Sequence, residues 1–181
     1  SLVGSEMCIR DRLYEDADGL IWIGTNVGVY IYNPETENFR KFDVATERGD
    51  VISREVSSIK CDSSGDLWIG VNWQGVFRYD RRDESLELYE PVPGDTTSLS
   101  SVHVWDLCFD GDGNLWVGSQ NGGLDRYDRE TDRFVRHRLK GLSDVSRIVL
   151  DKQNQLLLGT MKDGLFSFNP YMGTCQPLLL D

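Results

Sequence analysis

The chain repeats one short phrase four times, and this repetition constrains its fold more than any other feature. The copies are Asp16–Gly24, Asp62–Gly70, Asp110–Gly118 and Asp151–Gly159. A tryptophan lies six residues after the aspartate in the first three copies, and Leu157 takes that place in the fourth. The final glycines are 46, 48 and 41 residues apart. A fixed period of this size indicates a repeat architecture.

Each copy predicts four short strands. Apolar segments such as Ser58–Asp62 and Arg147–Asp151 stop at a turn rich in Asp, Gly and Asn. The turn leads into β-forming residues such as Leu67–Val71, and a glycine-containing loop then leads into Val76–Tyr79. A last turn precedes segments such as Phe134–His137. Four strands in roughly 40–50 residues are typical of a propeller blade, so we predict an all-β propeller with four-stranded antiparallel blades.

The period divides the chain into about four blades. We place them at residues 13–57, 58–106, 107–147 and 148–181, and the sequence leaves open whether the last is complete. An open piece of a larger ring is favoured over a closed four-blade domain, because no atypical capping repeat is visible. Residues 1–12 match no part of the repeat and resemble a translated sequencing-adapter artefact. We therefore set them aside as a non-native leader.

The repeated residues have expected structural roles. The turn aspartates and the glycines that follow them suit a tight turn with positive φ. The tryptophans are expected to pack between adjacent blades, and the glycines after them to allow close backbone approach or a bulge. The four sets of structural positions are Asp16, Trp22 and Gly24; Asp62, Trp68 and Gly70; Asp110, Trp116 and Gly118; and Asp151 and Gly159.

The charge of the chain narrows its partners. It has 30 acidic and 19 basic side chains, a net charge of −11. Nucleic acids and anionic lipids need a basic face, so we expect no nucleic-acid partner and no membrane contact by this segment. The sequence contains no apolar stretch of about 18 residues that would span a bilayer.

The phrase resembles the two-component regulator propeller repeat. The resemblance rests on D-x-x-G-x-[LI]-W-[IV]-G followed by G-[VL]-x-x-[YF], and it is weaker in the fourth copy, where Asn154 and Leu157 depart from Gly and Trp. It implies the periplasmic sensor region of bacterial hybrid histidine kinases, usually with seven blades. The remaining blades and signalling domains of a parent chain would then be partners, on the periplasmic or extracellular side of the inner membrane.

One face of such a propeller is the best candidate for ligand binding. Loops between the second and third strands share it with the long connections Val44–Glu55 and Pro91–Ser101. Amides and an extra tryptophan suit an oligosaccharide, because hydroxyls pair with amides and sugar faces stack on rings. The alternative is that these residues merely favour turns and that Trp73 packs on a neighbouring blade. The candidates are Asn26, Asn72, Trp73, Gln74, Gln120, Asn121, Lys162 and Asp163.

Other chemistry-bearing residues favour structural roles. We predict no catalytic residue, no metal site and no cofactor, since no hydrolase, P-loop, zinc-protease or dinucleotide motif occurs. Asp110–Asn114 invites a calcium interpretation, but a tight hairpin turn is favoured. His137 is expected on an exposed strand face, and His103 in a structural role. Cys61 and Cys108 are expected on opposite strand faces, and Cys175 has no evident partner.

Three functions follow as hypotheses. The first is a non-enzymatic module that senses a glycan-derived ligand and regulates a histidine kinase. The second is a propeller lyase or hydrolase, which would need a convergent acid–base pair. The third is a protein-interaction scaffold, and a homodimer is a further open possibility.

Overall fold

The computed structural model describes residues 12–178, and within them the chain forms four antiparallel four-stranded sheets and no α-helix. The first sheet contains β1 (Leu13–Glu15), β2 (Ile21–Thr25), β3 (Gly28–Asn33) and β4 (Asn38–Lys41). The second contains β5 (Val56–Cys61), β6 (Leu67–Val71), β7 (Gly75–Asp80) and β8 (Ser85–Tyr89). The third contains β9 (Val104–Phe109), β10 (Leu115–Ser119), β11 (Gly123–Asp128) and β12 (Arg133–His137). The fourth contains β13 (Arg147–Leu150), β14 (Leu156–Gly159), β15 (Leu165–Asn169) and β16 (Thr174–Pro177).

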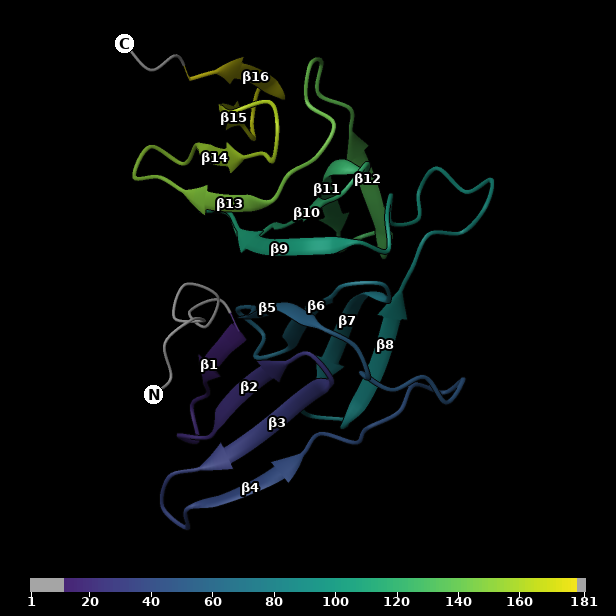
Figure 1. Cartoon of the computed structure of the whole chain (residues 1–181), viewed down its shortest axis with the longest axis vertical. Coiled ribbons are helices and arrows are strands. Elements are labelled where there is room, and N and C mark those ends of the chain that lie inside the picture. The colour runs from purple at the N-terminus through teal and green to yellow at the C-terminus, as the bar shows by residue number, and fades with distance from the viewer. Residues whose placement is uncertain (1–11, 179–181) are drawn as a thin grey trace.

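The four sheets are arranged as consecutive blades (Figure 1). Within each sheet the strands pair in chain order, so each blade is a simple meander. The first strands β5 and β9, and likewise β9 and β13, pack against each other, whereas the fourth strands lie at the periphery. The predicted propeller architecture is confirmed. Residues 1–11 of the leader that we set aside lie outside the described residues.

The repeated aspartate organises the turn between the first two strands. The Oδ1 atom of Asp62 accepts hydrogen bonds from the backbone N–H groups of Ser64 and Asp66, at 2.8 and 3.1 Å. Its Oδ2 atom accepts from Nε1 of Trp68 at 3.0 Å. Asp16 and Asp110 hold their own turns and tryptophans in the same way. The Asp110 segment is therefore a tight turn, as predicted.

The fourth turn keeps this geometry without its glycine or tryptophan. Asp151 accepts from the backbone N–H groups of Gln153 and Gln155 at 2.8 Å each. Asn154, in place of the glycine, has φ of 60°. Asparagine tolerates this left-handed conformation better than most residues, which explains why the turn survives the substitution.

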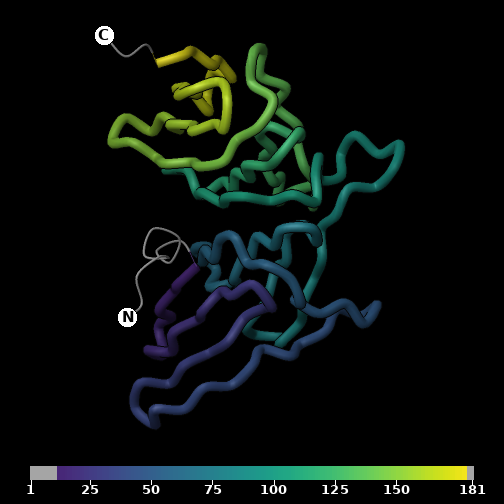
Figure 2. The backbone as a smooth tube through the Cα atoms, viewed as in Figure 1, coloured from purple at the N-terminus to yellow at the C-terminus, as the bar shows by residue number. Residues whose placement is uncertain are grey.

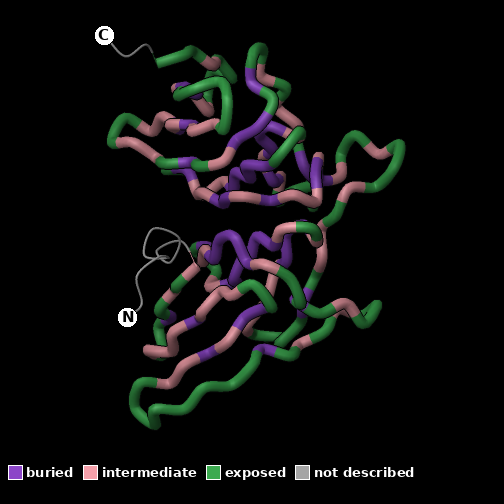
Figure 3. The backbone as a smooth tube through the Cα atoms, viewed as in Figure 1, coloured by how far each residue is buried: buried purple, intermediate pink, exposed green. Residues whose placement is uncertain are grey.

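The tryptophans pack between neighbouring blades, as predicted. Trp22 shares a buried cluster with residues of the second sheet, Trp68 with residues of the third, and Trp116 with residues of the fourth. Each tryptophan thus faces the blade that follows it. Figure 3 shows that burial concentrates in the middle of the molecule, where every residue of β6 and β10 is buried.

The glycines after the tryptophans allow the next blade to approach closely. A Cβ atom on Gly118 would lie 2.8 Å from both Cγ1 and the carbonyl oxygen of Val145. On Gly24 it would lie 2.6 Å from Cγ1 of Val56. Real Cβ atoms do not approach other atoms this closely, so the predicted close approach is confirmed at these positions. A Cβ atom on Gly159 would have no described neighbour closer than 3.6 Å, so the fourth blade lacks this close approach within the described residues.

The four blades do not close into a ring. Three buried clusters join the first blade to the second, the second to the third and the third to the fourth, and none among the described residues joins the fourth to the first. The outward face of the fourth blade leaves Val149 and Leu165 58% and 49% exposed. Among the described residues, this face of the fourth blade therefore has no neighbour.

The structure confirms the strand faces predicted for two cysteines but not the exposure predicted for His137. Cys61 packs toward the first blade and Cys108 toward the fourth, so they lie on opposite strand faces as predicted. The exposed position predicted for His137 is wrong. Its ring lies half-buried between Trp116 and Phe168, with centroids 5.0 and 5.5 Å away, because β12 turns this side toward the fourth blade.

Candidate functional site at the inner end of the blades

The predicted ligand-binding residues all lie in loops that follow the second strand of a blade. Asn26 lies between β2 and β3, and Lys162 with Asp163 lies between β14 and β15. The loop between β6 and β7 carries Asn72, Trp73 and Gln74, and the loop between β10 and β11 carries Gln120 and Asn121. The structure brings some of these residues together but not all of them.

A hydrogen-bonded network links the loops of the first three blades. Arg12 donates from Nη1 to Oδ1 of Asn26 at 3.2 Å and from Nη2 to Oε1 of Glu55 at 2.6 Å. Asn72 donates from Nδ2 to Oε2 of Glu55 at 3.5 Å. The Oδ1 atom of Asn72 lies 3.4 Å from Nδ1 of His103. The network therefore includes two predicted residues, Asn26 and Asn72, and crosses two blade boundaries.

Trp73 lies beside this network and is open to solvent. It directly follows Asn72, is 60% exposed and has φ of 69°. Such a conformation is uncommon for a large side chain and is often found where a ring is held for function. The ring of His103 contacts it edge-on, with centroids 4.0 Å apart. Trp73 therefore packs against the connection to the third blade, as the alternative expected, while much of its ring stays exposed.

A hollow of about 440 Å³ opens next to the network. It is where the inner strands of all four blades converge, so each blade contributes to its wall. Its residues are Arg12, Glu55, Ser57, Asn72, Trp105, Ser146, Arg147 and Met161. This combination of amide, hydroxyl, guanidinium and aromatic groups can bind a polar ligand with several hydroxyl groups.

Arg12 and Glu55, which both line the hollow, form an ion pair with each other. Arg12 and Glu55 have side chains 20% and 43% exposed, so their contact is partly shielded from water. Glu55 is the only carboxylate among the described lining residues. Glycoside hydrolysis ordinarily uses two carboxyl groups. The wall therefore suits binding better than that chemistry.

Gln74 has a structural contact in this loop. Its Nε2 atom donates to the carbonyl oxygen of Val51, and its Oε1 atom accepts from the backbone N–H of Ser53, both at 3.0 Å. It therefore fixes the connection between the first and second blades against the β6–β7 loop.

Of the remaining four candidates, only Gln120 contacts the network. Asn121 lines a separate hollow of about 400 Å³ together with Ser143. Asp163 lies 3.4 Å from the hydroxyl of Ser143. Lys162 is exposed, and Gln120 donates its backbone N–H to the carbonyl oxygen of His103. Asn121, Lys162 and Asp163 thus border the third and fourth blades, whereas Gln120 contacts the network through His103.

Sequence reasoning missed several lining residues. Arg12 fell in the segment that was set aside, and Glu55 and Arg147 belong to no repeated motif. Trp105 could have been found, because it is a tryptophan outside the repeat position, as Trp73 is. In the described part of the chain, no cluster of His, Cys, Asp or Glu is arranged to hold a metal ion. Nor does any helix of residues 12–178 have the length and apolarity needed to cross a membrane.

Comparison with known families identifies the repeat. The family described as two component regulator propeller matches residues 4–27 and 98–121, each of which covers or leads into a copy of the tryptophan phrase. Two copies of the repeat thus match the two-component regulator propeller model. The first match begins inside the leader that was set aside. No relative is found among curated protein sequences.

Solved structures share the fold of this chain. The extracellular domain of the putative hybrid two component system BT3049 from B. thetaiotaomicron has a TM-score of 0.80 and 17% identity, over 92% of this chain and 24% of that one. That of BT4673 from the same organism has a TM-score of 0.78 and 22% identity, over 95% and 24%.

A secretion-system component is also similar. PorZ, a surface component of the type-IX secretion system of Porphyromonas gingivalis, has a TM-score of 0.69 and 18% identity, over 97% of this chain and 29% of that one. The chain thus spans about a quarter of the length of these solved structures. At these identities the likeness establishes the propeller fold.

Proposed function

We propose that this chain is part of a non-enzymatic sensor propeller on the periplasmic or extracellular side of a bacterial two-component system, and that it binds a glycan-derived ligand. The observation that carries the proposal is the hollow lined by residues of all four blades, with Trp73 exposed beside it. Sugar rings stack on exposed aromatic faces, while amides and guanidinium groups pair with sugar hydroxyls. The extracellular sensor domains among the similar structures support this placement.

Contacts from several blades give such a ligand a way to signal. A ligand that touches several blades favours one relative arrangement of them. It can shift a two-state equilibrium only by its difference in affinity for the two states. A downstream histidine kinase is the proposed recipient of this change. A lyase or hydrolase and a protein-interaction scaffold remain the alternative functions.

The ligand proposal is tested by measuring oligosaccharide binding. We expect a set of plant and host oligosaccharides to include at least one that raises the melting temperature and changes tryptophan fluorescence. Trp73→Ala should weaken its binding by about tenfold, because the aromatic contact and the apolar area that it buries contribute roughly 1–2 kcal/mol. Phe39→Ala is the matched control, since Phe39 is 65% exposed on β4, the fourth strand of the first blade, and does not line the hollow.

Two results would contradict the proposal. One is that no oligosaccharide binds the wild-type chain. The other is that Trp73→Ala and Phe39→Ala reduce binding equally, which would place the ligand elsewhere or make the stacking nonspecific. Signalling is tested separately, by kinase autophosphorylation of a full-length parent sensor with and without the ligand that is found.

A further inference from the structure

The outer edge of the third blade is covered by a segment of the same chain. The connection between β8 and β9 runs along β12, where the backbone N–H of Phe134 donates to the carbonyl oxygen of Thr97 at 2.8 Å. Arg136 fixes the segment by donating to the carbonyl oxygens of Asp95, Ser98 and Leu99, at 2.9–3.0 Å. An extended segment therefore fits against the fourth strand of a blade in this fold.

The second blade has the same edge without such a segment. Leu86 is the counterpart of Phe134, because Tyr79 pairs with Leu86 as Tyr127 pairs with Phe134. Strand β8 pairs only with β7, and no described segment pairs with its other edge. Leu88 stands where Arg136 stands in β12, so the arginine that fixes the segment on the third blade has no equivalent here.

The connection that could have covered β8 folds on itself instead. Ala45 forms an antiparallel bridge with Val51, and the backbone N–H of Thr46 donates to the carbonyl oxygen of Asp50 at 2.9 Å. Figure 2 shows the two connections, after β4 and after β8, as long excursions of the backbone. Because the first one uses its backbone groups internally, it lies beside β8 without pairing with it.

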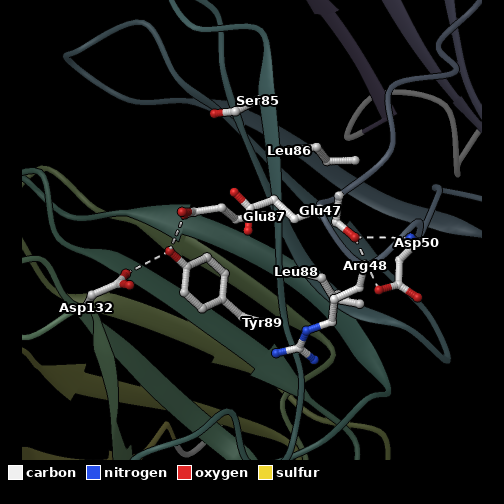
Figure 4. Close-up of a pocket in the computed structure, with 10 residues that line it drawn as sticks. Glu47, Arg48, Asp50, Ser85, Leu86, Glu87, Leu88, Tyr89 and Asp132 are labelled. Carbon is white, nitrogen blue, oxygen red and sulfur yellow. Dashed lines mark hydrogen bonds between the residues drawn. The ribbon is translucent and has the colours of Figure 1, made fainter.

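A groove separates this connection from β8 (Figure 4). Its volume is about 400 Å³, and it is lined by residues 46–48, 50 and 85–89 together with Asp132. A smaller hollow of about 160 Å³ shares Arg48, Leu88, Tyr89 and Asp132 with it and reaches the covered edge of the third blade. The groove thus follows the unpaired edge of β8.

The groove is acidic. Its lining contains the carboxylates of Glu47, Asp50, Glu87 and Asp132 and one guanidinium group, that of Arg48. Tyr89 forms part of its wall. The Tyr89 hydroxyl lies within hydrogen-bonding distance of two acceptors, Oε2 of Glu87 at 3.0 Å and Oδ1 of Asp132 at 2.7 Å. A positively charged occupant is therefore favoured, whereas β8 of a second copy would bring the same negative charges.

We propose that the outer edge of β8 is a docking site for an extended basic peptide segment, which adds to the second blade as a fifth strand. Backbone hydrogen bonds to β8 supply the pairing, and the acidic lining selects lysine or arginine side chains. The Asp95–Leu99 segment on β12 is the internal precedent for an extended chain in this position. This site lies at the periphery of the blades and is separate from the ligand hollow at their inner end.

The test uses fluorescent peptides and the complete chain in about 0.15 M salt, a concentration at which long-range charge effects are screened. The probe is a nine-residue peptide of alternating lysine and threonine, and its partner has glutamate in place of lysine. Two further versions of the probe carry N-methyl groups on the odd or the even backbone amides. Only alternate N–H groups of an added strand face the edge. We expect the glutamate peptide and one N-methylated register to bind at least about tenfold more weakly, and the other register to bind within about twofold of the probe.

A pair of charge reversals locates the binding. Glu47→Lys should weaken binding about threefold or more, while Glu35→Lys, in the turn between β3 and β4, should leave it unchanged. Equal binding of the two N-methylated registers would overturn strand addition. Equal effects of the two reversals would overturn the location, and a peptide-sensitive dimer in sedimentation experiments would identify a second copy as the occupant instead.

Discussion

At the scale of single residues, the turn aspartate accepts hydrogen bonds from its own turn and tryptophan and also contacts the next blade. Burial by itself would raise the pKa of Asp62, but hydrogen bonds from Trp68, Ser64, Asp66 and Arg129 lower it below its ordinary value. Stability from this group is therefore present near neutral pH and is lost as the pH falls through the lowered pKa. Arg129 reaches Asp62 from the next blade, at 2.9 Å, as Arg81 reaches Asp16 at 3.1 Å. The turn aspartates thus also join blades.

Asp125 is the residue whose charge is least well accommodated. It is fully buried where the second blade has the buried ring of Phe77. One oxygen accepts from the backbone N–H of Ser100 at 2.8 Å, and the other has no hydrogen-bond partner. Burial raises the pKa of Asp125 to about 6, although Ser100 and Arg136 act in the opposite direction.

Replacing Asp125 by asparagine should therefore stabilise the chain above pH 6. The folded-state pKa is raised, so the wild type loses stability as the pH rises from about 4 to about 6, and Asp125→Asn should not. A shift from 3.8 to about 6 corresponds to about 3 kcal/mol at pH 7.5. Urea unfolding between pH 4 and 8 measures this difference. Asp83→Asn, in the exposed turn between β7 and β8, is the control, and equal pH profiles for wild type and Asp125→Asn would refute the assignment.

At the scale of strands, each blade meets the next through the glycine after its tryptophan. The backbone of β10 at Gly118 lies against Val145, which precedes β13, and the strand pairing shifts register between Gly118 and Ser119. A side chain at this position would push the two blades apart. The fourth blade has the same glycine in β14, where no described residue lies close enough to exclude a side chain.

Two glycine substitutions separate these situations. Gly118→Ala should lower the free energy of unfolding by about 1–3 kcal/mol, because its Cβ would lie 2.8 Å from a backbone oxygen. Gly159→Ala should change it by less than about 1 kcal/mol, since its nearest contact is 3.6 Å. Denaturant unfolding of both variants provides the comparison. If both are equally destabilised, the cause is the strand backbone and not the neighbouring blade.

At the scale of the whole molecule, each described blade packs on the next, and no buried cluster of residues 12–178 joins the first blade to the fourth. The middle blades are buried on both sides, and the outer blades on one. In β2 only Trp22 is buried, and β14 alternates buried and partly exposed residues, whereas β6 and β10 are buried throughout. In a stack of repeats, stability comes from each unit and from its contacts with neighbours.

Amide hydrogen exchange should follow this order. We expect the slowest exchange in β6 and β10 and exchange at least about tenfold faster in β2 and β14, because the end blades can open without disturbing two interfaces. Exchange measured by mass spectrometry on dilute protein resolves the four strands. Uniform protection of all four would indicate that the end faces are covered, and a loss of that uniformity on dilution would assign the cover to self-association.

The amino-acid pattern is enough to predict the blades. The turn residues, the β-forming residues and the tryptophan phrase recur in the copies, so the strands, the Asp62-type turns and the role of Gly118 follow from the repeat. The sequence also indicated Asn26, Asn72 and Trp73 by topology. The folded structure was needed to show that these residues are joined through Arg12, Glu55 and His103. It was also needed to show that β8 has an unpaired acidic edge while the edge of β12 is covered. These contacts, like the burial of Asp125 and His137, bring together side chains from different blades or segments. Local propensity cannot predict them, because it carries no information about which distant groups will meet.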